Sequence, residues 1–328
     1  MKIRIGIVSY GNVGRGAEYA LMQNKDMELR YIFSRKNVSS IEPVTEGVPV
    51  KNVSEARMFA QEIDVLLLCG SSAAALPVQT PELAAHFNVV DSFDTHAKVA
   101  GHFDKVDAAA ASGKKTAVIA AGWDPGVFSL IRLINESVLP EGDNYTFYGY
   151  GVSQGHSDAI RQIDGVLDAR QYTVPVEASL RAVKNGERPA LTPRTIHRRV
   201  CYVTAAEGAD YTEIERRIVN MPDYFADNDT SVTFISNEEM AKNHSGMPHA
   251  GVSVRSGGTG LNGVNGQTME FNLKLDSNPE FTANILAMCA RAAYRLNKDG
   301  AYGCKTMFDI PPSYYSIKSA DELRRTLI

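Results

Sequence analysis

Cysteine is scarce in this chain of 328 residues, which has only four: Cys69, Cys201, Cys289 and Cys304. None belongs to a Cys-x-x-Cys pair or to a Cys/His cluster at ligand spacing. The pattern therefore excludes a disulfide framework and a structural zinc site. We expect reduced thiols in a cytoplasmic protein that needs no metal.

Long apolar runs and blocks of like charge are also missing. No segment approaches the roughly 18 consecutive apolar residues of a membrane span. Residues 1–5 enter a strand pattern directly, so we expect no secretory signal. The net charge is −4, and basic residues are spread along the chain. The composition gives no support for binding nucleic acid or an anionic membrane, although a local basic site can still bind a small anion.

The first part of the chain instead alternates short apolar strands with helices. The expected strands are residues 3–8, 27–33, 63–69, 88–93 and 115–120, and the expected helices are 14–22 and 96–112. This alternation predicts an α/β fold, a Rossmann-type doubly wound parallel sheet.

Near Pro125 the pattern changes to longer β-like stretches. These are residues 145–152, 197–204, 231–235 and 269–275, separated by Gly- and Asn-rich loops such as 256–266. They predict a second, α+β domain with a mostly antiparallel sheet, followed by an amphipathic helix over 281–296. We expect a dinucleotide-binding domain over 1–121, completed by 299–328, and a second domain over 122–298.

The turn after the first strand resembles the Gly-x-Gly-x-x-Gly dinucleotide fingerprint. Gly11 and Gly14 occupy the second and third glycine positions, and Ser9 replaces the first. A helix that begins here offers backbone N–H groups and a partial positive charge to a pyrophosphate. The alternative is an ordinary glycine-rich turn. The expected cofactor-binding residues are Tyr10, Gly11, Asn12, Val13 and Gly14.

The second strand ends in Ser34, Arg35 and Lys36, where an NAD enzyme usually has an acidic residue. A hydroxyl and two cations suit the 2′-phosphate of NADP, unless the two cations are simply solvated loop charges. The loop after the strand over 63–69 provides further expected cofactor contacts. They are Cys69, Gly70, Ser71 and Ser72, whose small size also suits a plain turn.

Two further strands end in acidic loops, at Asp94 and at Trp123-Asp124. If both strands belong to the parallel sheet, both carboxylates lie at its ligand-binding edge, beside the nicotinamide. Such a pair suits an ammonium substrate that is oxidised to an iminium. Each aspartate alone is more simply explained as a helix N-cap or a turn former.

At this point the chain resembles the meso-diaminopimelate dehydrogenase family over essentially its whole length. The resemblance rests on several runs: Tyr10 to Arg15, Phe33 to Arg35, Gly122 to Gly126, Ser153 to Ala159, Gln171 to Thr173, Met221 to Phe225, Gly246 to His249 and Leu275 to Pro279. The departures are Ser9, where the family often has Gly, and Tyr148, where it has Trp. The resemblance implies a homodimer that uses NADP to deaminate the D-centre of meso-2,6-diaminopimelate reversibly, with a substrate-binding and dimerisation domain over 122–298.

The resemblance also implies the roles of the site residues. Asp94 and Asp124 would be catalytic, facing the D-centre amine and the water that attacks the imine. The backbone at Gln154 and Gly155 would hold the nearby carboxylate. The remaining expected substrate-binding residues are Trp123, Tyr148, Thr173, Arg199, His249 and Asn278. His156 and Asp158 are expected to order the loop that carries Gln154.

Residue types alone leave alternatives open. Alternation along the strand does not decide whether Arg198 or Arg199 faces inward, and Thr173, His249 and Asn278 are also ordinary strand, loop and turn residues. Another NADP-dependent reductase or amino-acid dehydrogenase would share the cofactor loops. A non-catalytic NADP sensor would keep Gly11, Gly14 and Arg35 without needing the two aspartates and Arg199.

Overall fold

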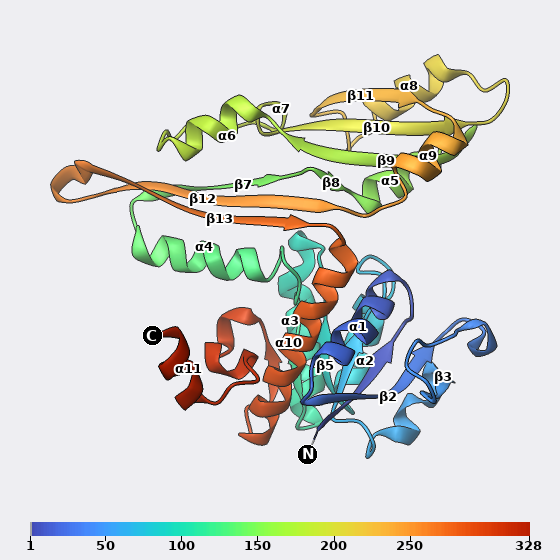
Figure 1. The fold of residues 1–328 in the computed structure, drawn as a ribbon, viewed down its shortest axis with the longest axis vertical. Coiled ribbons are helices and arrows are strands. Elements are labelled where there is room, and N and C mark those ends of the chain that lie inside the picture. The colour runs from blue at the N-terminus through green and yellow to red at the C-terminus, as the bar shows by residue number, and fades with distance from the viewer. Residues whose placement is uncertain (1) are drawn as a thin grey trace. The chain divides into compact units, whose positions relative to one another are not determined.

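Strand β1 (Ile3–Val8) is an inner strand of a seven-stranded parallel sheet, in the order β14-β6-β5-β4-β1-β2-β3. Figure 1 labels three strands of this sheet, β2, β3 and β5. The computed structural model describes residues 2–328. The other strands of this sheet are β2 (Met27–Ser34), β3 (Val50–Asn52), β4 (Val65–Leu68), β5 (Asn88–Asp91), β6 (Thr116–Val118) and β14 (Gly303–Lys305). Strands β1, β4, β5 and β6 are almost entirely buried, as is typical of parallel strands covered on both faces, whereas the edge strand β3 is partly exposed. The predicted Rossmann-type sheet is confirmed.

The helices of this unit are α1 (Asn12–Gln23), α2 (Leu76–Ala84), α3 (Val99–Ser112), α10 (Asn278–Lys298) and α11 (Ala320–Leu327), with short 3₁₀ turns η1 (Val38–Ser40), η2 (Val53–Phe59), η3 (His96–Lys98), η5 (Met307–Asp309) and η6 (Pro312–Tyr315). Helices α1, α2 and α3 contact strands of the sheet, whereas α11 has no buried residue. Helices α2 and α3 share one apolar cluster with β2, β4 and β5, which includes Phe33, Leu66 and Val89. Helix α10 lies beside α1, where a Cβ atom added at Gly16 would lie 3.1 Å from that of Ala283.

The chain divides into two units at other residues than the sequence suggests. Residues up to 130 and 279–328 form the first unit, and 131–278 form the second. The segment 279–298, which the sequence analysis assigned to the second domain, belongs to the first unit because α10 packs there. One such contact is the ion pair between Arg291 and Asp26, 2.6 Å long.

The second unit contains two sheets. One is three-stranded, in the order β13-β12-β7, and the other is four-stranded, in the order β11-β10-β9-β8. The strands are β7 (Gly142–Tyr148), β8 (Gly151–Val152), β9 (Val166–Pro175), β10 (His197–Ala205), β11 (Asp229–Phe234), β12 (His249–Thr259) and β13 (Asn265–Leu275). All these pairings are antiparallel except β10 with β11. The expected α+β character is therefore confirmed, with one sheet more than expected.

Helices cover these two sheets. They are α4 (Val127–Val138), α5 (Gln154–Arg161), α6 (Glu177–Lys184), α7 (Pro193–Ile196), α8 (Tyr211–Val219) and α9 (Asn237–Asn243), with the turn η4 (Leu261–Gly263). Helix α6 packs on one face of the three-stranded sheet through Leu180 and Val183. On the other face Arg255 donates to the carbonyls of Leu139 and Pro140, and so holds the carboxyl end of α4.

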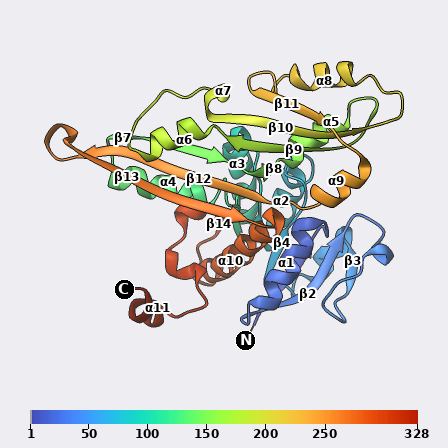
Figure 2. The same ribbon diagram turned by 45° about the horizontal axis from the view of Figure 1, so that its top comes forward.

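The structure corrects two of the expected elements. The strand predicted over 145–152 is broken into β7 and β8, since Gly149 has a φ of +133°. The loop predicted over 256–266 is mostly strand: β12 and β13 pair through Thr259 and Asn265 around η4, and form a hairpin that projects beyond the rest of its sheet (Figure 2). Hydrogen bonding along this hairpin overrides the turn-like composition of the segment.

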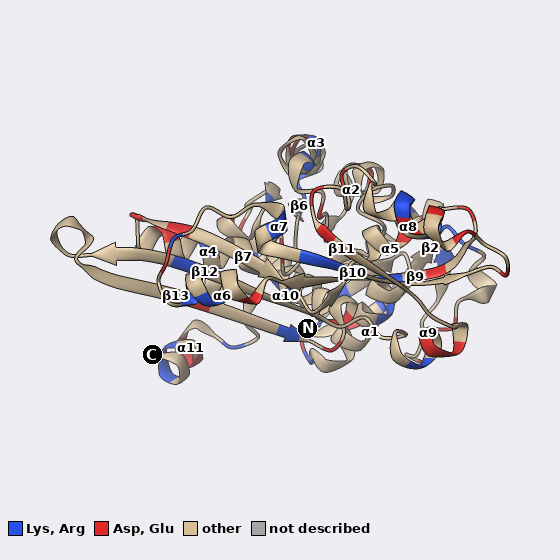
Figure 3. Ribbon diagram, turned by 90° about the horizontal axis from the view of Figure 1, so that it is seen from above, with Lys and Arg blue, Asp and Glu red and all other residues tan. Residues whose placement is uncertain are grey.

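Charged residues are distributed over both units. Figure 3 shows basic and acidic positions interspersed along the helices and strands. In the part of the chain that the structure describes, no helix is long and apolar enough to cross a membrane. Within residues 2–328 no group of three or more His, Cys, Asp or Glu side chains is arranged to hold a metal ion.

Candidate functional site

The turn after β1 is shaped by Ser9 rather than by a first glycine. Ser9 has a φ of +74°, in the left-handed region that glycine normally supplies. Its carbonyl oxygen approaches α1 so closely that a Cβ atom at Gly14 would lie 2.3 Å away. A Cβ atom at Gly11 would meet no atom within 4 Å. The backbone therefore makes the fingerprint turn despite the substitution, with open space where a pyrophosphate approaches the start of α1.

Tyr10 ties this turn to the segment around Thr45. Its hydroxyl donates to the buried carboxylate of Glu18, and the other oxygen of Glu18 accepts the Thr45 N–H at 2.5 Å. Burial and the bond to Glu18 raise the pKa of Tyr10. The guanidinium of Arg15 lies 5.8 Å from the ring centroid. Asn12 and Val13 form the first turn of α1, as expected from the sequence.

The carboxyl end of β2 forms a basic depression of about 410 Å³. Arg35 and Lys36 are exposed there, whereas Ser34 is buried and accepts the N–H of Lys36 at 3.0 Å. A third cation, Lys51, also lines the depression, because β3 pairs with β2 so that Lys51 is the partner of Phe33. Sequence reasoning missed Lys51, since the three-residue strand that carries it has no pattern of its own.

The loop after β4 packs against the same turn. A Cβ atom at Gly70 would lie 3.5 Å from the Ser9 hydroxyl oxygen and 2.9 Å from the Cβ of Ala75. Cys69 is buried, which raises the pKa of its thiol to about 12. Ser71 is exposed, and its carbonyl accepts the N–H of Ala75 at 2.8 Å. The loop over Cys69 to Ser72 thus follows β4 at the same edge of the sheet as the turn after β1.

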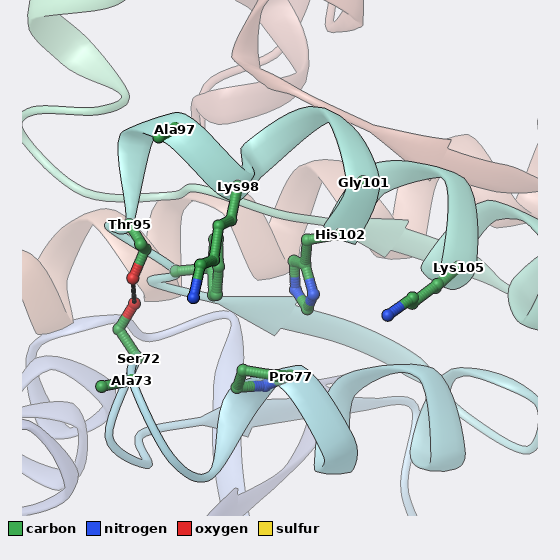
Figure 4. A pocket seen from close by; sticks show the side chains of 10 residues that line it. Ser72, Ala73, Pro77, Thr95, Ala97, Lys98, Gly101, His102 and Lys105 are labelled. Carbon is green, nitrogen blue, oxygen red and sulfur yellow. Dashed lines mark hydrogen bonds between the residues drawn. The ribbon is translucent and has the colours of Figure 1, made fainter.

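Ser72 connects this loop to the first of the two acidic loops. Its hydroxyl accepts the N–H of Asp94 at 2.8 Å and pairs with the hydroxyl of Thr95 at 3.3 Å. A cavity of about 620 Å³ lies beside this pair, between α2 and α3 (Figure 4). Lys98 of η3 and His102 of α3 line it, and Asp94 itself is exposed.

The second acidic loop follows the neighbouring strand β6. Val90 of β5 pairs with Val118 of β6, so Asp94 and Asp124 follow adjacent strands at one edge, as expected. Trp123 is buried, with its ring 5.3 Å from that of Phe128 in an edge-on arrangement. The structure thereby gathers the cofactor turn, the serine loop and both carboxylate loops in the first unit.

In the second unit Arg199 lies directly opposite Thr173 in the β9–β10 pairing. Its Nη1 donates to the Thr173 hydroxyl at 2.6 Å, while its Nε is buried with no hydrogen-bond partner among the described residues. No carboxylate of the described residues pairs with this guanidinium, and burial lowers the pKa of Arg199. Arg198 is exposed. Of the two neighbouring arginines, Arg199 is therefore the one that faces inward. Its guanidinium is partly buried without an anionic partner, which is unfavourable.

The start of α5 lies in the same region. Ser153 caps the helix, and its hydroxyl bonds to His156 Nδ1 at 2.7 Å. Gln154 and Gly155 are exposed in the first turn, so their backbone N–H groups point outward from the helix start. Burial, followed by the charge of Arg199, lowers the pKa of His156 to about 4. His156 therefore orders the loop as a neutral ring, and Asp158 pairs with Arg161 on the surface.

His249 enters this region through a space that glycine provides. A Cβ atom at Gly151 would lie 2.5 Å from the His249 ring, and Gly151 in turn pairs with Thr173. Burial lowers the pKa of His249. The N–H of Asn278 donates to the Met247 carbonyl at 3.0 Å, and Gln154 Nε2 lies 3.1 Å from the sulfur of Met247.

Tyr148 is positioned by a residue that sequence reasoning missed. His197 Nε2 accepts the N–H of Tyr148 at 2.7 Å, and the two rings stack with centroids 5.5 Å apart. Burial and the charge of Arg199 lower the pKa of His197 to about 4, so this acceptor stays neutral. A histidine two residues before Arg199 on a strand gives no signal by residue type, because its partner comes from β7.

Comparisons with known proteins agree on one family. The model of the diaminopimelic acid dehydrogenase C-terminal domain matches residues 122–277. Meso-diaminopimelate D-dehydrogenase of Acetivibrio thermocellus is 62% identical, covering 100% of this chain and 98% of the relative. The enzyme of that name from Lysinibacillus sphaericus is 52% identical, with 99% of each chain covered.

Solved structures of this kind match over the whole chain. The diaminopimelate dehydrogenase of Corynebacterium glutamicum in complex with diaminopimelate has a TM-score of 0.92 at 39% identity, covering 100% of this chain and 99% of the other. An engineered D-amino acid dehydrogenase bound to NADP⁺ has a TM-score of 0.87 at 37% identity, with 100% of both chains covered.

Proposed function

The chain belongs to the meso-diaminopimelate dehydrogenase family, and from this membership we propose that it oxidises the D-centre of meso-2,6-diaminopimelate with NADP⁺. The D-centre carbon loses a hydride, and its amine becomes an imine. Water then replaces the imine nitrogen and releases ammonia, which leaves L-2-amino-6-oxopimelate in equilibrium with tetrahydrodipicolinate. The reaction is reversible and belongs to bacterial lysine and cell-wall biosynthesis in the cytoplasm.

The observation that carries the substrate assignment is the unpaired guanidinium of Arg199. A partly buried cation with a buried, unbonded Nε is unfavourable unless a ligand supplies an anion. A carboxylate accepts two parallel hydrogen bonds from such a fork. Thr173, His249 and Asn278 complete this end of the pocket. We assign it to the L-centre of the substrate, which does not react.

The cofactor assignment rests on the first unit. Open space at Gly11 and the start of α1 fit a pyrophosphate, and the basic depression formed by Arg35, Lys36 and Lys51 fits the 2′-phosphate of NADP. Glu55 also lines this depression, and one of its carboxylate oxygens accepts the N–H of Asn52 at 2.9 Å, so three cations face one carboxylate there. When bound, the nicotinamide supplies the chemistry of hydride acceptance.

The protein's own part in the reaction is to hold and orient the substrate. Asp94 and Asp124 hold the reacting ammonium and orient the water that attacks the imine carbon. The N–H groups at Gln154 and Gly155 hold the carboxylate of the same centre, and Trp123 and Tyr148 pack over the carbon chain. A substrate whose L-centre binds Arg199 can present only its D-centre for oxidation.

We further assign the functional state to a homodimer. Its support is an apolar face on α4, where Leu133, Ile134 and Val138 are 43%, 45% and 59% exposed. Three large apolar side chains on one short segment are costly to leave in water, and a second copy of the chain would cover them.

The test is the initial rate of NADPH formation with meso-diaminopimelate and with its L,L isomer at equal concentration. An L-centre at the reacting position directs its C–H bond away from the nicotinamide, and a displacement of about 1 Å can cost about a hundredfold in rate. We therefore expect the meso isomer to react far faster. Similar rates for the two isomers would refute the two-ended pocket.

A further inference from the structure

A fully buried carboxylate, Asp91, lies at the end of β5 and has no role in the reaction as described so far. Its side chain is 0% exposed. Its Oδ2 accepts from the Thr80 hydroxyl at 2.7 Å and lies 2.8 Å from His102 Nε2, so the partners come from α2 and α3. A buried charge is costly, and it is retained only where partners fully satisfy it.

The other carboxylate oxygen of Asp91 holds both acidic loops. Oδ1 accepts the N–H of Phe93, just before Asp94, at 3.1 Å. It also accepts the N–H of Ala120 at 3.1 Å, in the segment that leads to Asp124. The backbone carbonyl of Asp91 accepts the N–H of Ala121, which follows Ala120, at 2.9 Å. One side chain thus connects the starts of both loops at a single atom.

The conformation of these loops depends on this connection. Ala120 has a φ of +53°, a left-handed conformation that is unfavourable for alanine and needs support from its surroundings. His102, the partner of Asp91, also stacks on Phe93, with ring centroids 4.2 Å apart. The network therefore fixes the backbone of one loop and both the backbone and the ring of the other.

We propose that Asp91 and His102 are positioning residues, which set the distance between the Asp94 and Asp124 loops without touching substrate or cofactor. The inference rests on the proposed function for the role of those two carboxylates. Since both loops share one hydrogen-bond acceptor, loss of that acceptor releases them together. Release of the loops should slow hydride transfer, because in the proposed function Asp94 and Asp124 of these loops hold the reacting ammonium.

The chain offers a matched control on the same strand. Asn88, the first residue of β5, is also buried and also crosslinks neighbouring strands. Its Oδ1 accepts the N–H of Thr116 at 2.9 Å, and its Nδ2 donates to the Asp64 carbonyl at 2.9 Å. These bonds lie at the amino end of the strands, away from the acidic loops. A general loss of sheet stability should follow from Asn88→Ala as well, but without release of the loops.

The experiment compares the full-length Asp91→Leu, His102→Phe and Asn88→Ala variants with the unmodified protein. Asp91→Leu keeps the branched shape of the side chain and removes both acceptor oxygens, whereas His102→Phe keeps the ring on Phe93 and removes the bond to Asp91. Two readouts are taken: the single-turnover rate of hydride transfer at saturating substrate, and quenching of Trp123 fluorescence by acrylamide. Trp123 is the only tryptophan, so its emission reports on the Asp124 loop independently of the reaction.

We expect Asp91→Leu to slow hydride transfer by about tenfold or more and to increase quenching of Trp123, and His102→Phe to have the same effects to a smaller extent. Asn88→Ala should lower the melting temperature with the transfer rate and the quenching nearly unchanged. Equal effects of all three variants on rate and quenching would overturn the proposal, and so would unchanged quenching in Asp91→Leu. If the variants change the quenching of Trp123 as expected but the unmodified protein does not oxidise meso-diaminopimelate, the proposed function is refuted and the positioning role is not.

Discussion

In the proposed function, Arg199 is the residue that binds the distal carboxylate of the substrate. Replacing it by alanine removes the charge-assisted contact to the distal carboxylate, for which we expect a loss of about 1.5–3 kcal/mol, or about 10- to 150-fold in kcat/KM. Arg199→Lys should recover only part of this loss, because an ammonium cannot form the planar fork. Steady-state kinetics with meso-diaminopimelate measure both variants.

The neighbouring Arg198 is the control, since its side chain is exposed on the same strand. Arg198→Ala should leave kcat/KM nearly unchanged. Binding of NADP⁺ without substrate should be unaffected in all three variants. Equal weakening of substrate and cofactor binding in Arg199→Ala would mean that Arg199 supports the fold instead.

The basic depression beside β2 gives a second prediction at this scale. Arg35→Asp should weaken NADP⁺ binding by about 1.5–3 kcal/mol, since a carboxylate replaces a cation beside the 2′-phosphate. Lys51→Ala should weaken it less, because it removes one half-buried charge and adds no opposite one. Titration with NADP⁺ and with NAD⁺ measures the preference between the two cofactors. The control is Lys25→Ala, because Lys25 lies just before the amino end of β2, at the other end of the strand from Arg35. Equal efficiency of the unmodified protein with both cofactors would contradict the assignment.

Single residues also show where sequence reasoning ended. The fingerprint turn was predicted from the sequence, with Ser9 as a departure from the glycine pattern. Only the backbone shows that Ser9 adopts a φ of +74°, which is typical of glycine. Thr173 and Arg199 were assigned by resemblance, and their pairing needed the register of β9 and β10. Lys51 and His197 had no signal, because each acquires its role from a strand that is distant in sequence or too short to detect.

At the scale of elements, the exposed face of α4 is where association can be tested. Replacing Leu133 and Val138 by serine removes apolar surface that a second copy would cover, while both positions stay on an exposed helix face. We expect sedimentation velocity to show dissociation at micromolar protein concentration. Val78→Ser on α2, where Val78 is 64% exposed, is the control and should change nothing. An unmodified protein that sediments as a monomer would refute the dimer.

Elements differed in how far their sequence determined them. Strands β1, β2 and β4 were predicted to within two residues at each end, because buried parallel strands carry continuous aliphatic runs. The hairpin of β12 and β13 was expected as a loop, since Gly and Asn dominate its tip. Pairing between the two strands decides its structure, and composition does not report pairing. Strand β14 was missed for the same reason: its partner β6 lies far away in the sequence.

At the scale of the whole molecule, the buried histidines predict how stability depends on pH. The pKa of His197 falls from its ordinary 6.5 to about 4 on folding, through burial and then the charge of Arg199. The unfolded chain therefore binds the proton first, and stability is complete above pH 6.5 and is lost as the pH falls towards 4. His197 alone contributes at most about 3 kcal/mol over this window.

Denaturant unfolding at several pH values between 7 and 4 measures this loss. His197→Gln, which keeps a hydrogen-bond acceptor for Tyr148 but does not titrate, should show a shallower decrease than the unmodified protein. His86→Gln changes an exposed histidine and should leave the slope unaltered. Identical slopes for the unmodified protein and His197→Gln would contradict the role given to burial at this position.

The division of the chain has a consequence for the order in which the protein is made. The second unit is one continuous stretch, 131–278, whereas the first unit needs residues from both sides of it. Strand β14 can pair with β6 only after the ribosome has translated β14. The ion pair between Arg291 and Asp26 likewise forms only after Arg291 has been translated. On the ribosome, the second unit is therefore available to fold first. The first unit waits for the final fifty residues, 279–328.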